Sequence, residues 1–105
     1  MKINIKEITM KDFKDLLNDE AFGPEAKEII YNYYKEELKD TEMTLETDNI
    51  EDFWKEYKTF EEFIKEEMFE TDQTDFTEEL IEEIDGLDIM VWKTDSENSL
   101  LLFYC

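Results

Sequence analysis

The chain has 105 residues, of which 31 are acidic and 11 are basic, and its formal net charge is −20. Every basic residue is a lysine, and the sequence contains no arginine and no histidine. With 41% hydrophobic and 14% aromatic residues, the chain is not an intrinsically disordered acidic tail. Its length fits one acidic domain, residues 1–105.

The residue types that are missing exclude several kinds of site. Without histidine, the commonest general base and zinc ligand is absent. The single cysteine, Cys105, can form neither an internal disulfide nor a zinc site, and this usage fits a reducing compartment. The two glycines, Gly23 and Gly86, cannot build a glycine-rich phosphate loop. We therefore predict no enzyme, no catalytic residue, no metal site and no cofactor.

The first half of the chain predicts a short strand and two helices. The stretch 2–8 alternates apolar and polar residues, which favours a strand. Thr9 is a predicted N-cap for a helix over 10–19, and Pro24 suits the first position of a helix over 24–39. The apolar residues that share the inner face of this second helix are Ala26, Ile29, Ile30, Tyr33 and Tyr34. Tyr31 lies outside that face.

Three further helices are predicted between residues 50 and 85. Ile50, Phe53, Trp54 and Tyr57 follow helical spacing, so 50–57 is the third helix. Thr59 with Glu62 forms a capping box that opens the fourth, Asp75 with Glu78 opens the fifth, and Gly86 follows its end. The inward residues of the fourth are Phe60, Phe63, Ile64 and Met68, and those of the fifth are Phe76, Leu80, Ile81 and Ile84.

The end of the chain changes to a β-type pattern. The apolar runs 87–93 and 100–104 flank the polar loop 94–99, which predicts a C-terminal hairpin. A hairpin alone is marginally stable, so it should pack on the helices, with the N-terminal strand as a candidate third member of its sheet. The predicted fold is thus α+β, with about five short helices packed on a C-terminal hairpin.

The negative charge is concentrated in one part of the sequence. Residues 46–85 hold 17 acidic residues and 3 lysines, and their carboxylates fall opposite the predicted apolar stripes. Glu78–Glu82, Glu79–Glu83 and Glu62–Glu66 are like-charge pairs at i, i+4, a spacing that destabilises a helix. Five carboxylates on the eight residues 78–85 give about one charge per 2.4 Å of helix, against about 1.7 Å in duplex DNA.

This density makes the acidic face a candidate surface for a basic partner. The predicted partner-binding residues are Glu46, Asp48, Glu51, Asp52, Glu61, Glu62, Glu66, Glu70, Asp72, Asp75, Glu78, Glu79, Glu82, Glu83 and Asp85. Tyr31 and Phe69 could add stacking where nucleobases would stack. The alternative for Phe69 is that the fourth helix ends early and this side chain covers the core. Adaptation to high salt, or a need for solubility alone, could also produce such an acidic surface.

In size, charge, lack of arginine and the acidic run 61–85 (EEFIKEEMFETDQTDFTEELIEEID), the chain resembles small phage-encoded inhibitors of host defence. These are the anti-CRISPR and anti-restriction proteins that act as DNA mimics. They share no common sequence pattern, so no residue role transfers by position. The resemblance implies an inhibitor, in the cytoplasm of a bacterial host, that occupies the basic DNA-binding groove of a nuclease, for example of the Cas9 type. Such an inhibitor makes no direct contact with nucleic acid, and the negative charge predicts no membrane partner, since an anionic leaflet would repel this surface.

Two other functions fit the same charge pattern. An immunity protein or antitoxin would neutralise a basic nuclease toxin, and an acidic adaptor subunit would bind a basic protein without inhibiting it. The three differ in partner and genetic setting and share the same electrostatic basis.

Overall fold

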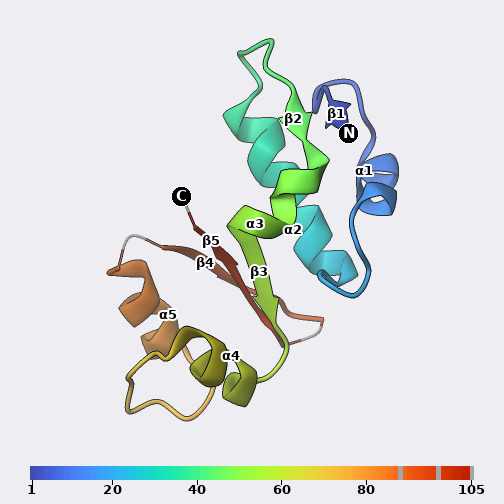
Figure 1. The fold of residues 1–105 in the computed structure, drawn as a ribbon. Helices are drawn as coiled ribbons and strands as arrows, with labels where there is room; N and C mark the ends of the chain where they lie inside the picture. The colour runs from blue at the N-terminus through green and yellow to red at the C-terminus, as the bar shows by residue number, and fades with distance from the viewer. Residues whose placement is uncertain (88, 97, 105) are drawn as a thin grey trace. The chain divides into compact units, whose positions relative to one another are not determined.

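The computed structural model describes residues 1–87, 89–96 and 98–104 and divides the chain into two compact units, Met1–Asp52 and Phe53–Cys105 (Figure 1). Helices and antiparallel strands both occur in the described residues, which confirms the α+β class. Two residues of the predicted hairpin lie outside the described ones, Asp88 in its first run and Glu97 in its loop, and so does the single cysteine, Cys105.

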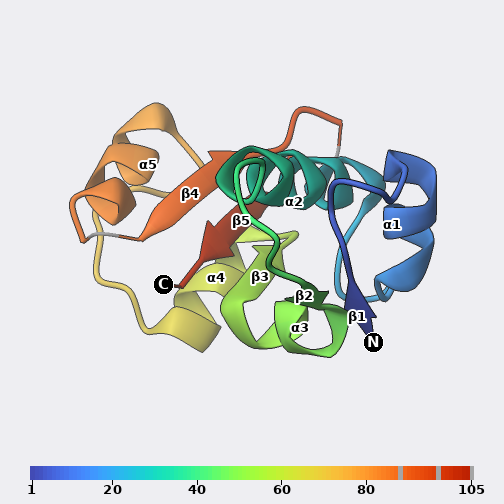
Figure 2. The same ribbon diagram turned by 90° about the horizontal axis from the view of Figure 1, so that it is seen from above.

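The first unit combines two helices with a small antiparallel ladder. Strand β1 (Lys2–Ile3) pairs with β2 (Leu45–Glu46), and α1 (Met10–Leu16) packs against α2 (Pro24–Glu37), as Figure 2 shows. A 3₁₀ turn, η1 (Thr47–Asn49), follows β2. The buried apolar residues of this unit are Ile5, Phe13, Leu17, Phe22, Ala26, Ile30, Tyr31 and Ile50.

Tyr31 corrects the prediction for α2, because its side chain is only 5% exposed. The phenol ring lies 5.4 Å from the ring of Phe13 on α1, and the hydroxyl donates a hydrogen bond to the Ile8 carbonyl at 3.0 Å. The side of α2 that bears Tyr31 is therefore covered by α1 and by the segment before α1. The apolar periodicity of α2 alone would assign this side to solvent. Tyr31 consequently offers no surface for base stacking.

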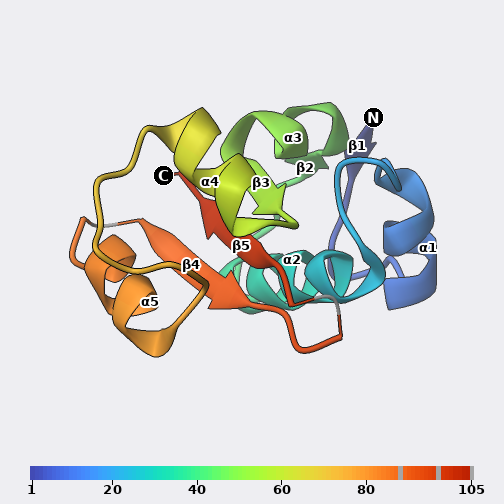
Figure 3. The ribbon, with the colours of Figure 1, turned by 90° about the horizontal axis from the view of Figure 1, so that it is seen from below.

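The second unit is a three-stranded antiparallel sheet in the order β3-β5-β4. Its strands are β3 (Trp54–Tyr57), β4 (Met90–Lys93) and β5 (Leu100–Phe103). The predicted hairpin is confirmed, since β4 pairs with β5 from Met90↔Phe103 to Lys93↔Leu100. Helices α4 (Phe60–Glu67) and α5 (Glu78–Asp85) lie on one face of this sheet (Figure 3).

Two predictions about this sheet are wrong. The third strand is β3, whereas the N-terminal strand pairs with β2. The predicted helix 50–57 is a single helical turn, α3 (Ile50–Phe53), followed directly by β3. Strand β5 accounts for both differences: Leu100, Leu101 and Leu102 are at most 1% exposed, so β5 is a central strand that needs a partner on each edge.

The aromatic residues of β3 suit that role. Trp54 pairs with Phe103 and Tyr57 with Leu100, and aromatic side chains are favoured in strands. Pairing with β5 therefore stabilises residues 54–57 as a strand more than their helical spacing stabilises a helix. Tertiary contacts here decide between two local patterns.

One apolar cluster joins the sheet to α4 and α5. Its fully buried members are Tyr57, Phe63, Phe76, Leu80, Ile84, Leu100 and Leu102. Leu100 and Leu102 alternate along β5 and so share the sheet face that the two helices cover. This cluster fixes α4 and α5, which bear most of the predicted interface.

Threonines begin three of the helices. The Oγ1 atoms of Thr9 and Thr59 accept hydrogen bonds from the amides of Asp12 and Glu62, at 3.2 and 3.1 Å, which confirms both predicted caps. Helix α5 differs from its prediction, because Thr77 is the cap and accepts from the Leu80 amide at 3.2 Å. The carboxylate of Asp75 instead accepts from the amide of Phe76 at 2.8 Å, so the helix begins after Thr77 and not directly after Asp75.

The end of α4 decides between the two predictions for Phe69. The helix ends at Glu67, and Met68 adopts a left-handed conformation (φ 52°) with its side chain 84% exposed. The prediction that Met68 faces inward is therefore wrong, because this backbone reversal turns it outward. The same reversal brings Phe69 back onto the core cluster, with its ring 5.5 Å from that of Phe63. The alternative, in which Phe69 covers the core, is confirmed.

The cap of α5 gives a test of this arrangement. We expect Thr77→Ala to lower the free energy of unfolding by about 1 kcal/mol, because the Leu80 amide loses its acceptor. Chemical denaturation followed by circular dichroism measures the change. Thr74→Ala, at an exposed threonine of the same segment, is the matched control and should change stability little. Equal losses in the two variants would show that Thr77 is not the cap.

Candidate acidic interface

The fifteen predicted partner-binding residues divide between the two units. Four belong to the first unit: Glu46, Asp48, Glu51 and Asp52. The other eleven belong to the second, from Glu61 to Asp85. The predicted surface therefore consists of two groups, one in each unit.

The group in the first unit is partly neutralised. The amino group of Met1 donates to the carboxylates of Glu46 and Asp48, at 3.1 Å in the case of Asp48. These hydrogen bonds raise the pKa of the amino group above its ordinary value. Glu51 and Asp52 are exposed on α3. Two of the four carboxylates therefore already have a cationic partner.

Every member of the group in the second unit is exposed. Three of its residues lie on α4, three in the segment between the helices, and five on α5. All eleven side chains are exposed: Glu61, Glu62, Glu66, Glu70, Asp72, Asp75, Glu78, Glu79, Glu82, Glu83 and Asp85. We call these eleven residues the acidic face of the second unit.

The acidic face has no cationic partner among the residues that the structure describes. Within residues 1–87, 89–96 and 98–104, none of its carboxylates lies within 4.0 Å of a lysine nitrogen. The first unit differs, since Lys39 pairs with Glu36 at 2.7 Å and Lys27, only 4% exposed, pairs with Asp19. The hydrogen bond from Lys27 lowers the pKa of Asp19. Acidic residues in the two units therefore have different electrostatic surroundings.

Helix α5 concentrates the repulsion. It spans eight residues, five of which are acidic, and it contains the pairs Glu78–Glu82 and Glu79–Glu83 at i, i+4. Each like-charge pair of this kind costs an isolated helix about 0.2–0.5 kcal/mol. The helix is retained because Leu80 and Ile84, at 0% and 1% exposed, are buried in the core cluster.

Two uncharged side chains orient part of the acidic face. Thr71 Oγ1 donates to Glu83 Oε2 at 2.7 Å, and Gln73 Nε2 donates to Glu79 Oε2 at 2.9 Å. The side-chain amide oxygen of Gln73, Oε1, in turn accepts from Thr77 Oγ1 at 2.7 Å. The sequence prediction missed Thr71 and Gln73. Their position in the polar break between two acidic helices was the available signal.

Glu67 is the carboxylate on α4 that turns away from the acidic face. Its Oε1 accepts from the hydroxyl of Tyr57 at 2.5 Å and from the hydroxyl of Tyr104. Burial of Tyr57, followed by its hydrogen bond to Glu67 and nearby negative charge, raises the pKa of this phenol well above its usual value. This carboxylate therefore ties the end of α4 to β3 and to the residue after β5.

Other kinds of site find no support in the described residues. They contain no group of three or more acidic or cysteine side chains placed to hold a metal ion. No helix formed by them is long and apolar enough to cross a membrane. Comparison of the chain with family models, with curated proteins and with solved structures gives no match. A function must therefore be inferred from the geometry and charge of the chain itself.

The repulsion on α5 predicts a stabilising substitution. We expect Glu82→Lys to raise the free energy of unfolding by about 0.5 kcal/mol, because the repulsion with Glu78 becomes an i, i+4 attraction. Glu82→Gln, which only removes the repulsion, should give about half of this gain. Denaturation at low salt measures both, and the gain should shrink near 1 M salt, where the Debye length is about 3 Å. An unchanged or lower stability of Glu82→Lys would show that the repulsion is not significant.

Tyr57 predicts a change of stability at high pH. Because the folded state raises its pKa above the unfolded value of 10.0, the neutral phenol stabilises the fold below pH 10, and this stabilisation is lost as the pH rises further. We expect Tyr57→Phe to remove a phenol that ionises well above pH 10 in a spectrophotometric titration. Tyr33→Phe is the control and should retain it. If Tyr57→Phe leaves the titration curve unchanged at its alkaline end, the Tyr57–Glu67 contact is not as described.

Proposed function

We propose that this protein is an acidic DNA mimic that binds the nucleic-acid-binding groove of a basic nuclease and blocks DNA binding. The observation that supports the proposal most strongly is the acidic face of the second unit, with eleven exposed carboxylates and no lysine partner in the described part of the chain. Uncompensated charge of this kind costs stability, so its retention favours a use in binding.

The spacing of the charges supports a mimic of the phosphate backbone. Five carboxylates on the eight residues of α5 correspond to about one charge per 2.4 Å, at about 1.5 Å rise per residue. Duplex DNA has about one charge per 1.7 Å of axis. A groove lined with Lys and Arg that accepts DNA would attract this face for the same reason. A Cas9-type nuclease, whose heteroduplex channel is positively charged, is our first choice of target.

The packing of α4 and α5 also supports the proposal. Helices α4 and α5 are fixed to the sheet by one apolar cluster, and Thr71 and Gln73 hold two of the carboxylates by hydrogen bonds. A charged surface that is already ordered loses little conformational entropy on binding. This property fits an inhibitor that must compete with a DNA substrate.

Competition with DNA is the direct test. We expect the protein, added before DNA, to prevent a gel shift of a Cas9-type nuclease loaded with its guide RNA, and to do so less well as salt rises. Glu78→Lys with Glu82→Lys should weaken the competition at least about tenfold, because two attractions become repulsions. Glu7→Lys with Glu20→Lys, at two exposed residues of the first unit, makes the same change in net charge. We expect this control pair to have little effect.

The outcomes separate the proposal from its alternatives. A panel of restriction nucleases and nuclease toxins, tested in the same way, covers other targets of the same class. If the protein and DNA bind one nuclease together without interference, mimicry is wrong and an adaptor role replaces it. Equal losses from the two charge-reversal pairs would mean that net charge alone determines binding.

A further inference from the structure

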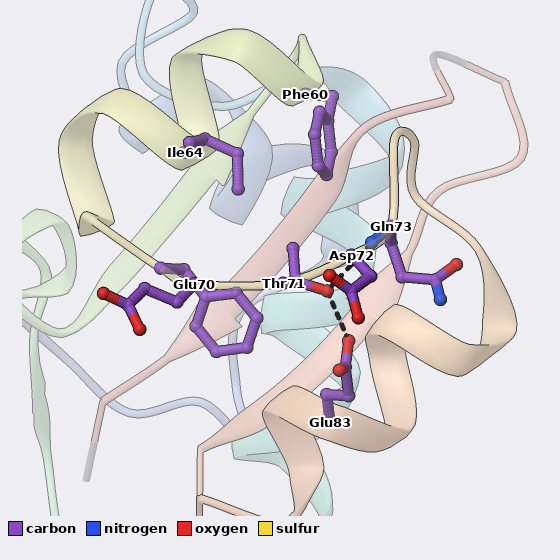
Figure 4. A pocket seen from close by; sticks show the side chains of 8 residues that line it. Phe60, Ile64, Glu70, Thr71, Asp72, Gln73 and Glu83 are labelled. Atoms are coloured by element: carbon purple, nitrogen blue, oxygen red, sulfur yellow. Dashed lines mark hydrogen bonds between the residues drawn. The ribbon is translucent and has the colours of Figure 1, made fainter.

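A hollow in the second unit lies within the acidic face. Its volume is about 540 Å³, it is largely open to solvent, and it is bordered by α4, the segment after it and α5 (Figure 4). The side chains that line it are Phe60, Ile64, Phe69, Glu70, Thr71, Asp72, Gln73 and Glu83. This volume is within the range of about 300–1,000 Å³ for sites that receive a ligand.

The two sides of the hollow differ in chemistry. Phe60 and Ile64 point into it from α4, and Glu83 approaches from α5 on the opposite side (Figure 4). Phe60, Ile64 and Phe69 are half-buried and belong to the margin of the core cluster. The rim carries the exposed carboxylates of Glu70, Asp72 and Glu83. An occupant must therefore combine an apolar part with a positively charged end.

Most hydrogen-bonding groups in the hollow that remain available to a ligand are acceptors. The Thr71 hydroxyl is used in its bond to Glu83, and the Gln73 amide is used in its bonds to Glu79 and Thr77. What remains at the rim is carboxylate oxygen, which only accepts hydrogen bonds. No described lysine pairs with Glu70, Asp72 or Glu83, and the chain has no arginine. A cationic donor that replaces water at these carboxylates would come from another molecule.

We propose that the hollow receives one arginine side chain of the basic partner, an inference that rests on the proposed function. The methylene stem would lie along Ile64, and the guanidinium would lie against the aromatic side and donate to the rim carboxylates. Arginine fits better than lysine because its planar group stacks on aromatic rings, is more weakly hydrated and can donate to two carboxylate oxygens at once. The acidic face thereby contains a specific contact as well as a general charge.

The walls of the hollow are held in place before binding. The rings of Phe60 and Phe76 lie 6.0 Å apart, and those of Phe63 and Phe69 lie 5.5 Å apart, so both aromatic walls are packed on the core. The Gln73 backbone amide donates to Thr71 Oγ1 at 3.1 Å, which fixes the turn at the rim. A preformed pocket reduces the entropic cost of binding a side chain.

The test uses the ¹⁵N-labelled protein and Nα-acetylarginine amide as the probe. We expect the amide signals of residues 69–73 and of Glu83 to shift on titration, with weaker shifts for Nα-acetyllysine amide and none for Nα-acetylnorleucine amide. Glu70→Gln with Asp72→Asn should weaken arginine binding at least about fivefold, since two rim charges are lost. Glu78→Gln with Glu82→Gln removes the same number of charges from α5 outside the hollow. This control pair should weaken binding less than about twofold.

The outcomes distinguish this inference from the proposed function. Equal losses in the two double variants, or equal shifts with the norleucine probe, would overturn the arginine site. Absence of shifts at residues 69–73, in a protein that still competes with DNA for the nuclease, would overturn the site and leave the proposed function intact. If the arginine probe binds the hollow and competition with DNA fails, the site stands and the proposed function is wrong. The spectra of the variants report directly whether each one is folded.

Discussion

The packing of α4 and α5 on Leu100 and Leu102 is the contact on which the second unit depends. These leucines are at most 1% exposed and lie on the sheet face that meets Phe63, Leu80 and Ile84. Burying one such side chain contributes about 1.5–3 kcal/mol, whereas one like-charge pair on a helix costs about 0.2–0.5 kcal/mol. The apolar cluster therefore outweighs the repulsion on α5, and a highly charged surface can coexist with an ordered fold.

The two units handle their acidic residues differently. In the first unit, lysines pair with Asp19, Glu28 and Glu36, so part of the negative charge is neutralised where it arises. In the acidic face of the second unit, the described carboxylates have hydrogen-bond donors such as Thr71 and Gln73 but no cationic partner. Neutral donors orient a carboxylate and leave its charge in place. This difference is the physical reason for locating the proposed binding surface in the second unit.

Local signals predict much of this fold. The caps Thr9 and Thr59, the start of α2 at Pro24 and the C-terminal hairpin each follow from a few neighbouring residues, and all of them occur in the structure.

The wrong predictions arise where contacts between residues far apart in the sequence determine the local structure. The spacing of Trp54 and Tyr57 is typical of a helix. In the structure these residues form strand β3, because the buried strand β5 needs a partner on its second edge. Tyr31 is buried against the segment that contains Ile8, and the residue pattern of α2 carries no information on that contact. Helical periodicity predicts the exposure of the acidic residues, whereas the hollow beside Phe69 depends on the backbone reversal at Met68.

The pair of tyrosines that bind Glu67 has a consequence for mapping the surface by mutation. Glu67 belongs to the same acidic run as its neighbours Glu66 and Glu70, yet its carboxylate is a structural acceptor for Tyr57 and Tyr104. A charge-reversal scan along α4 would place a lysine beside two phenols and the core. Glu67→Lys would therefore weaken the proposed binding through loss of structure. Residues that are adjacent in such a scan can therefore report on two different properties, the fold at Glu67 and the surface at Glu66.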